Sequence, residues 1–170
     1  MGRDKALLRW GEQTVAEHLA AIVFKVAGSI CLVGEPKRYK HLGLATIADI
    51  RPGTGPLGGL ETALSVTEAD YNLILACDLP DVPQHLLNEL MSVAEGGDWD
   101  CVAACDADGR RHPLCAVYRR RCLDRIQHAL STGEYRLLRV LDSLNVHWHQ
   151  ARCVLSNVNT PEEWYAIERP

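Results

Sequence analysis

Residues 49–59 read Asp-Ile-Arg-Pro-Gly-Thr-Gly-Pro-Leu-Gly-Gly and constrain the fold more than any other stretch. Four glycines and two prolines in eleven positions disfavour a helix interior and a central strand, so we expect a shaped loop. The apolar run 44–50 before it predicts a short buried strand, and residues 59–66 after it favour a helix. Strand-to-helix loops bind ligands in α/β proteins, and glycines leave backbone N–H groups open to an electron-rich group. A tight turn that binds nothing is the alternative interpretation.

A second candidate loop follows residues 71–76, whose sequence Tyr-Asn-Leu-Ile-Leu-Ala predicts a strand buried on both faces. Residues 77–83, Cys-Asp-Leu-Pro-Asp-Val-Pro, then place the Asp78 carboxylate at the carboxyl end of that strand. Carboxylate oxygens suit Mg²⁺, which binds proteins through one or two carboxylates while substrate phosphates supply further ligands. The alternative is that Asp78 begins a turn or caps a helix. Two such loops at one sheet edge favour a nucleotide site.

The alternation of strand and helix patterns predicts an α/β fold of the three-layer, Rossmann-like type, with a mostly parallel sheet and helices on both faces. Thr14 and Glu17 form a capping-box pattern at the start of the first helix. The expected strands are residues 29–33, 44–50, 71–76, 100–104, 113–118 and 146–154. The expected helices are residues 15–27, 36–42, 59–66, 83–94, 120–130 and 135–144.

Composition narrows the class of partner. At 170 residues the chain predicts one domain, residues 1–170, and its net charge of −4 gives no electrostatic reason to bind nucleic acid. The longest apolar run, residues 19–26, contains Lys25 and is too short to cross a bilayer, so we expect a cytoplasmic protein without a membrane contact. Seven cysteines without a CxxC pair favour reduced thiols over disulfides or a zinc site. A small-molecule partner is expected.

The C-terminal third contains two further polar patterns. His147 and His149 alternate along an expected strand and point to one side of it. A solvated or hydrogen-bonded pair is favoured there over a metal site, because spacing indicates no third ligand. Residues 157–163, Asn-Val-Asn-Thr-Pro-Glu-Glu, predict a helix start with Thr160 as N-cap, Pro161 at the first helical position and Glu163 completing a capping box. This capping leaves Asn157 and Asn159 unexplained.

Several common nucleotide and hydrolase motifs are absent from the sequence, including GxxxxGK[ST], GxGxxG and GxSxG. Five other segments, in this order, resemble the molybdenum cofactor guanylyltransferases, which are nucleotidyltransferases of the nucleotide-diphospho-sugar transferase fold. The resemblance covers nearly the whole chain and rests on residues 1–8, 49–60, 77–80, 112–114 and 157–163.

The resemblance implies transfer of GMP from GTP to molybdopterin, with Mg²⁺ and release of pyrophosphate. Lys5 and Asp78 would be the catalytic residues, and Asn157 and Asn159 would face the pterin substrate. Asp49 would contact the guanine nucleotide, through its base or ribose because a carboxylate repels phosphate. The implied nucleotide-binding residues are Lys5, Asp49, Gly53, Gly55, Pro56, Leu57, Gly58, Gly59 and Asp78, with Asp78 as metal ligand.

Two alternatives stay open at this point. One is a related nucleotidyltransferase that uses CTP or another acceptor, since spacing does not derive the choice of base. The other is an inactive accessory or binding protein. Other proteins of the cofactor pathway or of molybdoenzyme maturation would be further partners.

The resemblance also marks one departure. Family members carry a first strand and a Leu-Ala-Gly-Gly-x-Ser-x-Arg segment ahead of Met-Gly-x-Asp-Lys, and Met1 here occupies that internal methionine. We therefore expect residues 1–170 to be an N-terminally incomplete domain. Removal of a central strand leaves two rows of backbone groups unpaired, so we expect this chain to fold and bind GTP properly only after extension upstream by about 15–20 residues.

Overall fold

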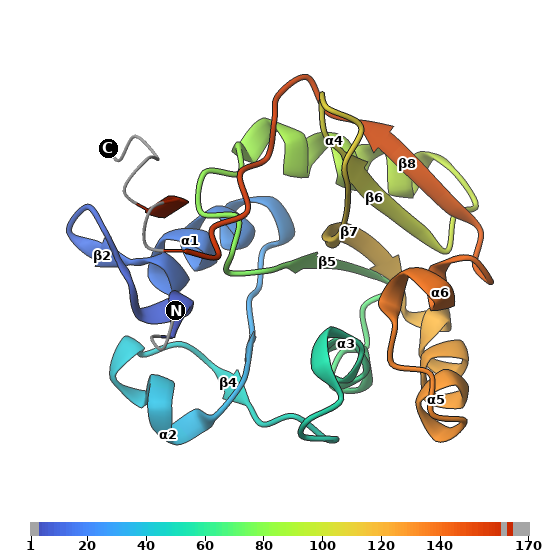
Figure 1. Ribbon diagram of the computed structural model, residues 1–170, viewed down its shortest axis with the longest axis horizontal. Helices are drawn as coiled ribbons and strands as arrows, with labels where there is room; N and C mark the ends of the chain where they lie inside the picture. The colour runs from blue at the N-terminus through green and yellow to red at the C-terminus, as the bar shows by residue number, and fades with distance from the viewer. Residues whose placement is uncertain (1–3, 161–162, 165–170) are drawn as a thin grey trace.

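The computed structural model describes residues 4–160 and 163–164, in which helices and strands alternate in an α/β fold (Figure 1). Residues 1–3 of the first motif and Pro161 lie outside the described residues. The elements, with η for 3-10 helices, are η1 (Lys5–Leu7), β1 (Arg9–Trp10), β2 (Gln13–Thr14), α1 (Val15–Ala27), β3 (Leu32–Val33), α2 (Pro36–Tyr39), η2 (Lys40–Leu42), β4 (Thr46–Ile47), α3 (Gly55–Ser65), β5 (Tyr71–Leu75), α4 (Gln84–Gly96), β6 (Cys101–Cys105), β7 (Arg111–Arg119), η3 (Arg120–Cys122), α5 (Leu123–Ser131), α6 (Leu137–Leu141) and β8 (Val146–Gln150).

Helix α1 begins and ends as its sequence predicts. The Thr14 hydroxyl accepts a bond of 3.2 Å from the Glu17 N–H, and the Glu17 carboxylate accepts one of 2.7 Å from the Thr14 N–H. At the other end Gly28 takes a φ of 75°, and its N–H donates to the Phe24 carbonyl. Both ends are therefore satisfied by neighbouring residues alone.

The strands form separate ladders. The largest sheet has the order β5-β7-β6-β8, in which β7 is antiparallel to β5 and β6 while β6 and β8 are parallel. β3 and β4 form a parallel pair, and β1 and β2 an antiparallel one. Within the described residues, β3 and β5 each have a partner on one edge only.

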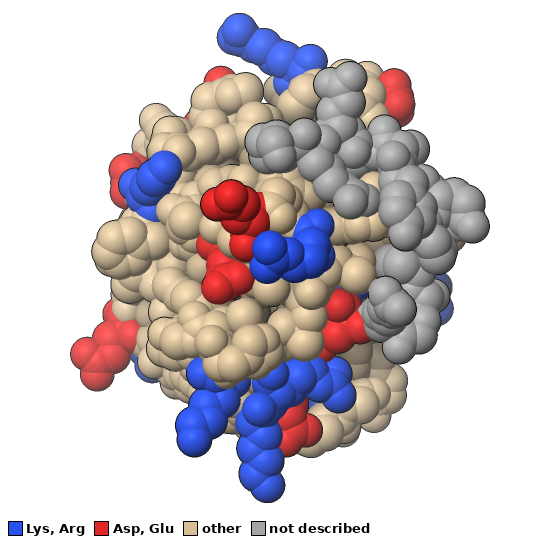
Figure 2. Space-filling view, turned by 90° about the vertical axis from the view of Figure 1, so that its left-hand side faces the viewer, with Lys and Arg blue, Asp and Glu red and all other residues tan. Residues whose placement is uncertain are grey.

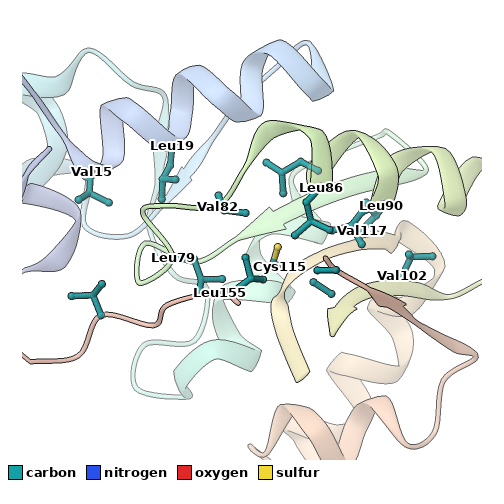
Figure 3. Packing of buried hydrophobic residues seen from close by; sticks show 14 of the residues in the cluster. Val15, Leu19, Leu79, Val82, Leu86, Leu90, Val102, Cys115, Val117 and Leu155 are labelled. Carbon is teal, nitrogen blue, oxygen red and sulfur yellow. The ribbon is translucent and has the colours of Figure 1, made fainter. Parts of the chain in front are cut away.

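Strands β6 and β7 lie between two hydrophobic clusters because their side chains alternate between the two faces. Val102, Cys115 and Val117 point toward α1 and α4, where they meet leucines such as Leu86 and Leu90 (Figure 3). On the opposite face the strands contribute to a cluster with α3, α5 and α6, and these strand residues are Cys101, Ala103, Ala116 and Tyr118. In Figure 1 α4 lies above β5, and α3 and α5 lie below it. The core is thus divided in two by the sheet.

Several strands differ from their predicted bounds. Residues 29–33 and 44–50 were each expected to form a strand, but pairing is limited to the two-residue strands β3 and β4. β7 is longer than expected, since it spans nine residues and pairs on both edges.

The expectation that residues 71–76 form a strand buried on both faces is wrong for β5. All five residues of β5 are only half-buried, whereas the first four residues of β6 are fully buried. β5 is at the edge of its sheet among the described residues, so its apolar side chains lack neighbours on one side.

Each helix within residues 4–160 and 163–164 is too short or too polar to span a bilayer.

Leu90 tests the packing of the first cluster. Its side chain is fully buried against β6 and β7, so Leu90→Ala should lower the free energy of unfolding by about 2–5 kcal/mol through lost burial and a residual cavity. Leu138→Ala is the matched control, because Leu138 is 49% exposed and should change stability by less than about 0.5 kcal/mol. Urea unfolding followed by circular dichroism measures both. Equal effects of the two substitutions would contradict this description of the core.

Candidate functional site

The glycine-rich segment turns into a helix earlier than its composition predicted. Helix α3 begins at Gly55 rather than Gly59, so Gly58 also lies inside the helix. Gly53 and Gly55 have φ of 83° and 66°, a left-handed backbone that favours glycine. The expected loop is therefore shortened to residues 49–54.

Gly58 is required by close packing inside the first turns of α3. A Cβ atom there would lie 1.9 Å from the Thr54 hydroxyl oxygen and 3.2 Å from the Arg51 carbonyl oxygen. That hydroxyl donates to the same carbonyl over 2.7 Å, so it is not free to move aside. Glycine costs about 1 kcal/mol relative to alanine inside a helix, and this contact explains why it is nevertheless present.

Contacts from α3 hold the loop in place. The Arg51 Nε lies 3.1 and 3.0 Å from the two carboxylate oxygens of Glu61, whose side chain is fully buried. The Thr62 hydroxyl accepts a bond of 3.0 Å from the Ile50 N–H and donates one of 2.9 Å to the Gly58 carbonyl. Sequence reasoning missed Arg51, Glu61 and Thr62, and the one available signal was a carboxylate within an otherwise apolar helix pattern.

A cavity of about 350 Å³ lies between this loop and the end of β5. Its lining includes Asp49, Gly55, Pro56, Gly59, Ala76, Cys77 and Leu114. Thr54 makes no side-chain cap at α3, so the first N–H groups of the helix keep their capacity to bind an electron-rich ligand.

Five of the nine expected nucleotide-binding residues do not line this cavity: Lys5 and Asp78, which are described below, and three residues of the glycine-rich segment. The Leu57 side chain is fully buried in the second hydrophobic cluster, and Gly58 packs beneath Thr54. Gly53 shapes the turn ahead of the helix. These residues determine the form of the loop.

Asp78 lies in a turn directly after β5 and is tied to the C-terminal segment. Its carboxylate Oδ2 accepts a bond of 2.9 Å from the Asn157 side-chain amide, and its carbonyl accepts one of 2.8 Å from the Val158 N–H. Helix α4 has Pro83 as its N-cap, so the alternative that Asp78 caps a helix is wrong. The Asn157 Oδ1 atom is buried and has no hydrogen-bond partner among the described residues.

Lys5, near the start of the sequence, lies beside the same C-terminal segment that contacts Asp78. Its ammonium group donates a bond of 2.6 Å to the side-chain oxygen of Asn159. Asp4 fixes the short helix that carries Lys5, because its carboxylate accepts bonds from the Ala6 N–H at 3.1 Å and the Tyr39 hydroxyl at 2.7 Å. Burial and then Asp4 raise the pKa of Tyr39 to about 12, so this hydroxyl stays a donor. The structure thus brings Lys5, Asp78, Asn157 and Asn159 together beyond the carboxyl end of β5, and we refer to this place as the sheet edge.

Basic residues lie beside this edge as well. Figure 2 shows Lys and Arg side chains gathered at the lower border of one face, where α2 and η2 lie, and these elements carry Lys37, Arg38 and Lys40. Arg38 is 3.2 Å from the Asp4 carboxylate, which places the group next to η1. Such a local field attracts anionic ligands even though the chain is acidic as a whole.

A buried hydrogen bond between Asp106 and His112 lies beside the C-terminal segment. Burial raises the pKa of the Asp106 carboxyl, but bonds from His112 and from the Arg110 and Leu155 backbone outweigh this and hold the pKa below its ordinary value. The His112 Nε2 lies 2.9 Å from Asp106, and the Ala107 N–H donates to the Cys153 carbonyl. The pair therefore lies beside the path that leads to Asn157.

The segment ends in the predicted capping box. The Thr160 hydroxyl accepts a bond of 3.1 Å from the Glu163 N–H, and the Glu163 carboxylate accepts one of 3.0 Å from the Thr160 N–H. The same carboxylate accepts a bond of 2.6 Å from the Asn159 N–H. Glu163 therefore holds the backbone of Asn159, while the Asn159 side chain accepts the bond from Lys5.

The surroundings of Cys77 disfavour its thiolate form. Burial, followed by the nearby Asp4 and Asp78 carboxylates, raises the pKa of its thiol to about 11, although Lys5 opposes the shift. The thiol stays protonated near neutral pH, whereas nucleophilic attack needs the thiolate.

The two histidines of β8, His147 and His149, contact protein side chains from other elements. The His149 Nε2 lies 3.0 Å from the Glu89 carboxylate, and the His147 ring packs on Trp99 with centroids 5.0 Å apart. The hydrogen-bonded interpretation is confirmed for His149.

A metal ion at Asp78 would need ligands from elsewhere. Among the described residues no group of three or more His, Cys, Asp or Glu side chains is placed to hold a metal ion. One carboxylate beside a buried amide oxygen fits Mg²⁺, because this ion commonly takes one or two protein carboxylates and completes its shell with substrate phosphates and water.

Comparison with known proteins gives matches along nearly the whole chain. The family model for the MobA-like NTP transferase domain matches residues 1–150. A probable molybdenum cofactor guanylyltransferase of Flavobacterium johnsoniae is 30% identical over 96% of this chain and 87% of its own length. The molybdenum cofactor guanylyltransferase of Haemophilus influenzae is 29% identical over 95% of this chain and 87% of its own length.

A solved structure shows the same fold. Molybdopterin-guanine dinucleotide biosynthesis protein A of Archaeoglobus fulgidus superposes with a TM-score of 0.76, at 20% identity, over 96% of this chain and 88% of that one.

The Asp106–His112 pair predicts a pH effect on stability. Because the folded state holds the pKa of Asp106 below its ordinary value, the pair contributes stability above about pH 4 and loses it as the pH falls further. Asp106→Asn should therefore lower the free energy of unfolding by about 1–3 kcal/mol at pH 7, and the difference between the two proteins should shrink as the pH falls below about 4. Urea unfolding over this pH range measures the difference. Asp108→Asn, an exposed carboxyl of the same turn, is the control, and an equal loss from that variant would contradict the assignment.

Proposed function

The chain belongs to the MobA-like NTP transferase family, and we propose that it transfers GMP from GTP to molybdopterin, which releases pyrophosphate and forms the guanine dinucleotide cofactor. The names of the two relatives support this enzyme class. The observation that carries the proposal is the meeting of Lys5, Asp78, Asn157 and Asn159 at the edge that also holds the glycine-rich loop. This edge offers one cation, one carboxylate and two amides beside open helix N–H groups.

The guanine nucleotide occupies the cavity beside α3. Asp49 and Gly59 lie together there, with the Asp49 Oδ1 3.9 Å from the position of a Cβ at Gly59, so a planar base can approach bare backbone. Asp49 accepts hydrogen bonds from the base or ribose, because its charge repels phosphate. The backbone of Gly55 and Pro56 borders the same ligand, and Gly53, Leu57 and Gly58 keep the loop in shape.

Lys5 and Asp78 serve the phosphates. Lys5 neutralises phosphate charge after exchanging its bond to Asn159 for one to the nucleotide. Asp78 holds Mg²⁺, with its carboxylate oriented by the Asn157 amide. When bound, the ion screens the phosphate charge and orients the phosphate oxygens.

Asn157 and Asn159 receive the acceptor. Their side chains lie on the C-terminal segment and contact Asp78 and Lys5. Amides both donate and accept hydrogen bonds, which suits a pterin or its phosphate. The terminal phosphate oxygen of molybdopterin forms a bond to the α-phosphorus of GTP while the bond to the leaving pyrophosphate breaks. The chain supplies position and charge, and no protein nucleophile takes part.

The proposal includes a cytoplasmic, single-domain enzyme of three-layer, Rossmann-like architecture with a mostly parallel sheet. The helices on either side of β6 and β7 support the layered architecture, and β3–β4 and β6–β8 are parallel pairs. The expected mostly parallel sheet departs from the pairing among the described residues, because β7 is antiparallel to both of its neighbours. The alternative to this proposal is that the enzyme uses CTP in place of GTP, as other nucleotidyltransferases of this fold do.

A direct assay tests the activity. The protein is incubated with molybdopterin, Mg²⁺ and either GTP or CTP, and pyrophosphate release and the mass of the dinucleotide product are measured. We expect product with GTP and at least about tenfold less with CTP, a difference of about 1.4 kcal/mol. Preference for CTP would favour the rival enzyme, and folded protein without product from either nucleotide would favour an accessory role.

Asp78→Asn tests the metal assignment. It should lower kcat about 100-fold at saturating Mg²⁺, equivalent to about 2.7 kcal/mol of lost transition-state stabilisation, with little change in unfolding free energy. Asp124→Asn, an exposed carboxyl on α5, is the matched control and should leave kcat unchanged. If Asp78→Asn keeps full activity while losing about 1 kcal/mol of stability, the carboxylate has only a turn-forming role.

The asparagine pair tests the acceptor side. Replacing Asn157 and Asn159 with Ala should raise the Kd for molybdopterin at least about tenfold more than the Kd for GTP, because the lost amides face the acceptor. Isothermal titration with each ligand measures both constants. Equal weakening of both ligands, together with a lower melting temperature, would indicate that the amides only brace the loop.

A further inference from the structure

The turn that carries Asp78 is held only weakly by its own backbone. The Leu79 N–H donates to the Ala76 carbonyl over 3.4 Å, and the Val82 N–H donates to the Leu79 carbonyl over 3.3 Å. Both bonds are longer than the usual distance of about 2.9–3.0 Å. The direction of the Asp78 carboxylate therefore depends on contacts from elements outside the turn.

The C-terminal segment supplies some of these contacts. The Asn157 amide donates to the Asp78 carboxylate. The hydroxyl and the N–H of Ser156 donate to the Asp81 carboxylate. Pro80, between the two aspartates, is buried and lacks an N–H group, so its carbonyl is its one polar backbone group and needs a donor.

His18, near the start of α1, provides this donor. One nitrogen of its ring bonds to the Pro80 carbonyl. The Nδ1 atom of the ring lies 3.3 Å from the side-chain amide nitrogen of Gln13. An amide nitrogen only donates, so Nδ1 accepts and the single proton of the neutral ring is on Nε2. Nε2 is therefore the atom that donates to Pro80.

The surroundings of His18 keep the ring neutral and in place. Its centroid lies 5.4 Å from that of the Trp10 ring, and Trp10 packs on Trp164 with centroids 5.9 Å apart. Burial lowers the pKa of His18, and the bond to Pro80 opposes this only in part, so the ring is neutral near pH 7. The capping box at the start of α1 fixes the backbone beneath the ring.

The contacts of His18 indicate an indirect role. A general base must lie within hydrogen-bond reach of the proton that it removes. Both ring nitrogens of His18 already bond to protein groups, at Gln13 and at Pro80. Pro80 is two residues from Asp78, so a shift of the Pro80 carbonyl moves the backbone that carries the carboxylate.

We propose that His18 is a positioning residue of the candidate site, whose Nε2–H group holds the Pro80 carbonyl and thereby fixes the direction of the Asp78 carboxylate. Helix α1 and the C-terminal segment then hold the turn together. The inference rests on the proposed function in one respect, the role of Asp78 as metal ligand. Removal of a group that orients a metal ligand lowers metal affinity or activity by about 10–100-fold.

Two substitutions separate the hydrogen bond from the packing. His18→Phe keeps a ring against Trp10 but loses the donor. His18→Gln loses the ring but places an amide N–H group close to the position of Nε2. If the bond to Pro80 matters, Gln is the milder change, whereas Phe is the milder change if packing alone matters. The same two substitutions at His128, an exposed residue of α5, are the matched controls.

Hydrogen exchange of the metal-free protein reports on the turn without any turnover. The Val158 N–H donates to the Asp78 carbonyl over 2.8 Å, so its exchange rate shows how firmly the turn is held. We expect about tenfold faster exchange at Val158 in His18→Phe and less than about threefold change in His18→Gln. The Gly28 N–H, at the far end of α1, should keep its rate and show that the helix is intact.

Metal binding and turnover provide the second measurement. Binding of Mn²⁺, a spectroscopic substitute for Mg²⁺, is followed by electron paramagnetic resonance in the presence of GTP. Pyrophosphate release is followed over a range of Mg²⁺ concentrations. His18→Phe should raise both the Kd for Mn²⁺ and the half-saturating Mg²⁺ concentration at least about tenfold, and His18→Gln should stay within about threefold of the parent.

The order of the two variants decides the outcome. A larger effect of His18→Gln than of His18→Phe on Val158 exchange would overturn the proposal, because the ring would then act through packing alone. Unchanged exchange, or unchanged Mn²⁺ affinity, in His18→Phe would overturn it as well. A parent protein that neither binds Mn²⁺ nor releases pyrophosphate would contradict the proposed function, while faster Val158 exchange in His18→Phe would still support the hold of His18 on the turn.

Discussion

β7 is hydrogen-bonded along both edges, to β5 and to β6, and the positions of the other strands in the sheet follow from it. Its side chains alternate between two cores, so one strand supplies Val117 to the helices on one face and Tyr118 to those on the other. Pro113 lacks an N–H group, yet it lies within β7 because the register with β6 shifts at Ala103 and Ala104 and the pairing with β5 ends at Cys115. Pro113 thus lies in the part of β7 where neither β5 nor β6 pairs with it, so its missing N–H group leaves no carbonyl of these strands without a donor.

Local chemistry made part of this fold predictable. Thr14 and Glu17 satisfy each other within one turn, so the start of α1 is readable from the sequence. The start of α3 was misplaced because composition does not reveal that Gly58 lies against Thr54. The burial of β5 was overestimated for a similar reason. An apolar run indicates that a strand favours burial, but it does not show whether neighbouring elements are present to bury it.

The candidate site was predictable only in pieces. The apolar run before Asp78 was enough to place this residue at the end of a strand. Its bond to Asn157, however, joins residues 79 positions apart, and the bond between Lys5 and Asn159 joins residues 154 positions apart. No periodicity connects such pairs, so the resemblance to a family gave the grouping that spacing did not. The Arg51–Glu61 pair escaped notice because a buried carboxylate on a helix looks in sequence like an exposed one.

The bond between Lys5 and Asn159 joins segments that lie 154 residues apart. The C-terminal segment that carries Asn157 and Asn159 also buries Ala151, Leu155 and Val158 in the first hydrophobic cluster. Detachment of this segment would therefore expose part of the core and release Asp78 and Lys5 from their amide partners in the same event. The integrity of the polar site is thus coupled to the stability of the core.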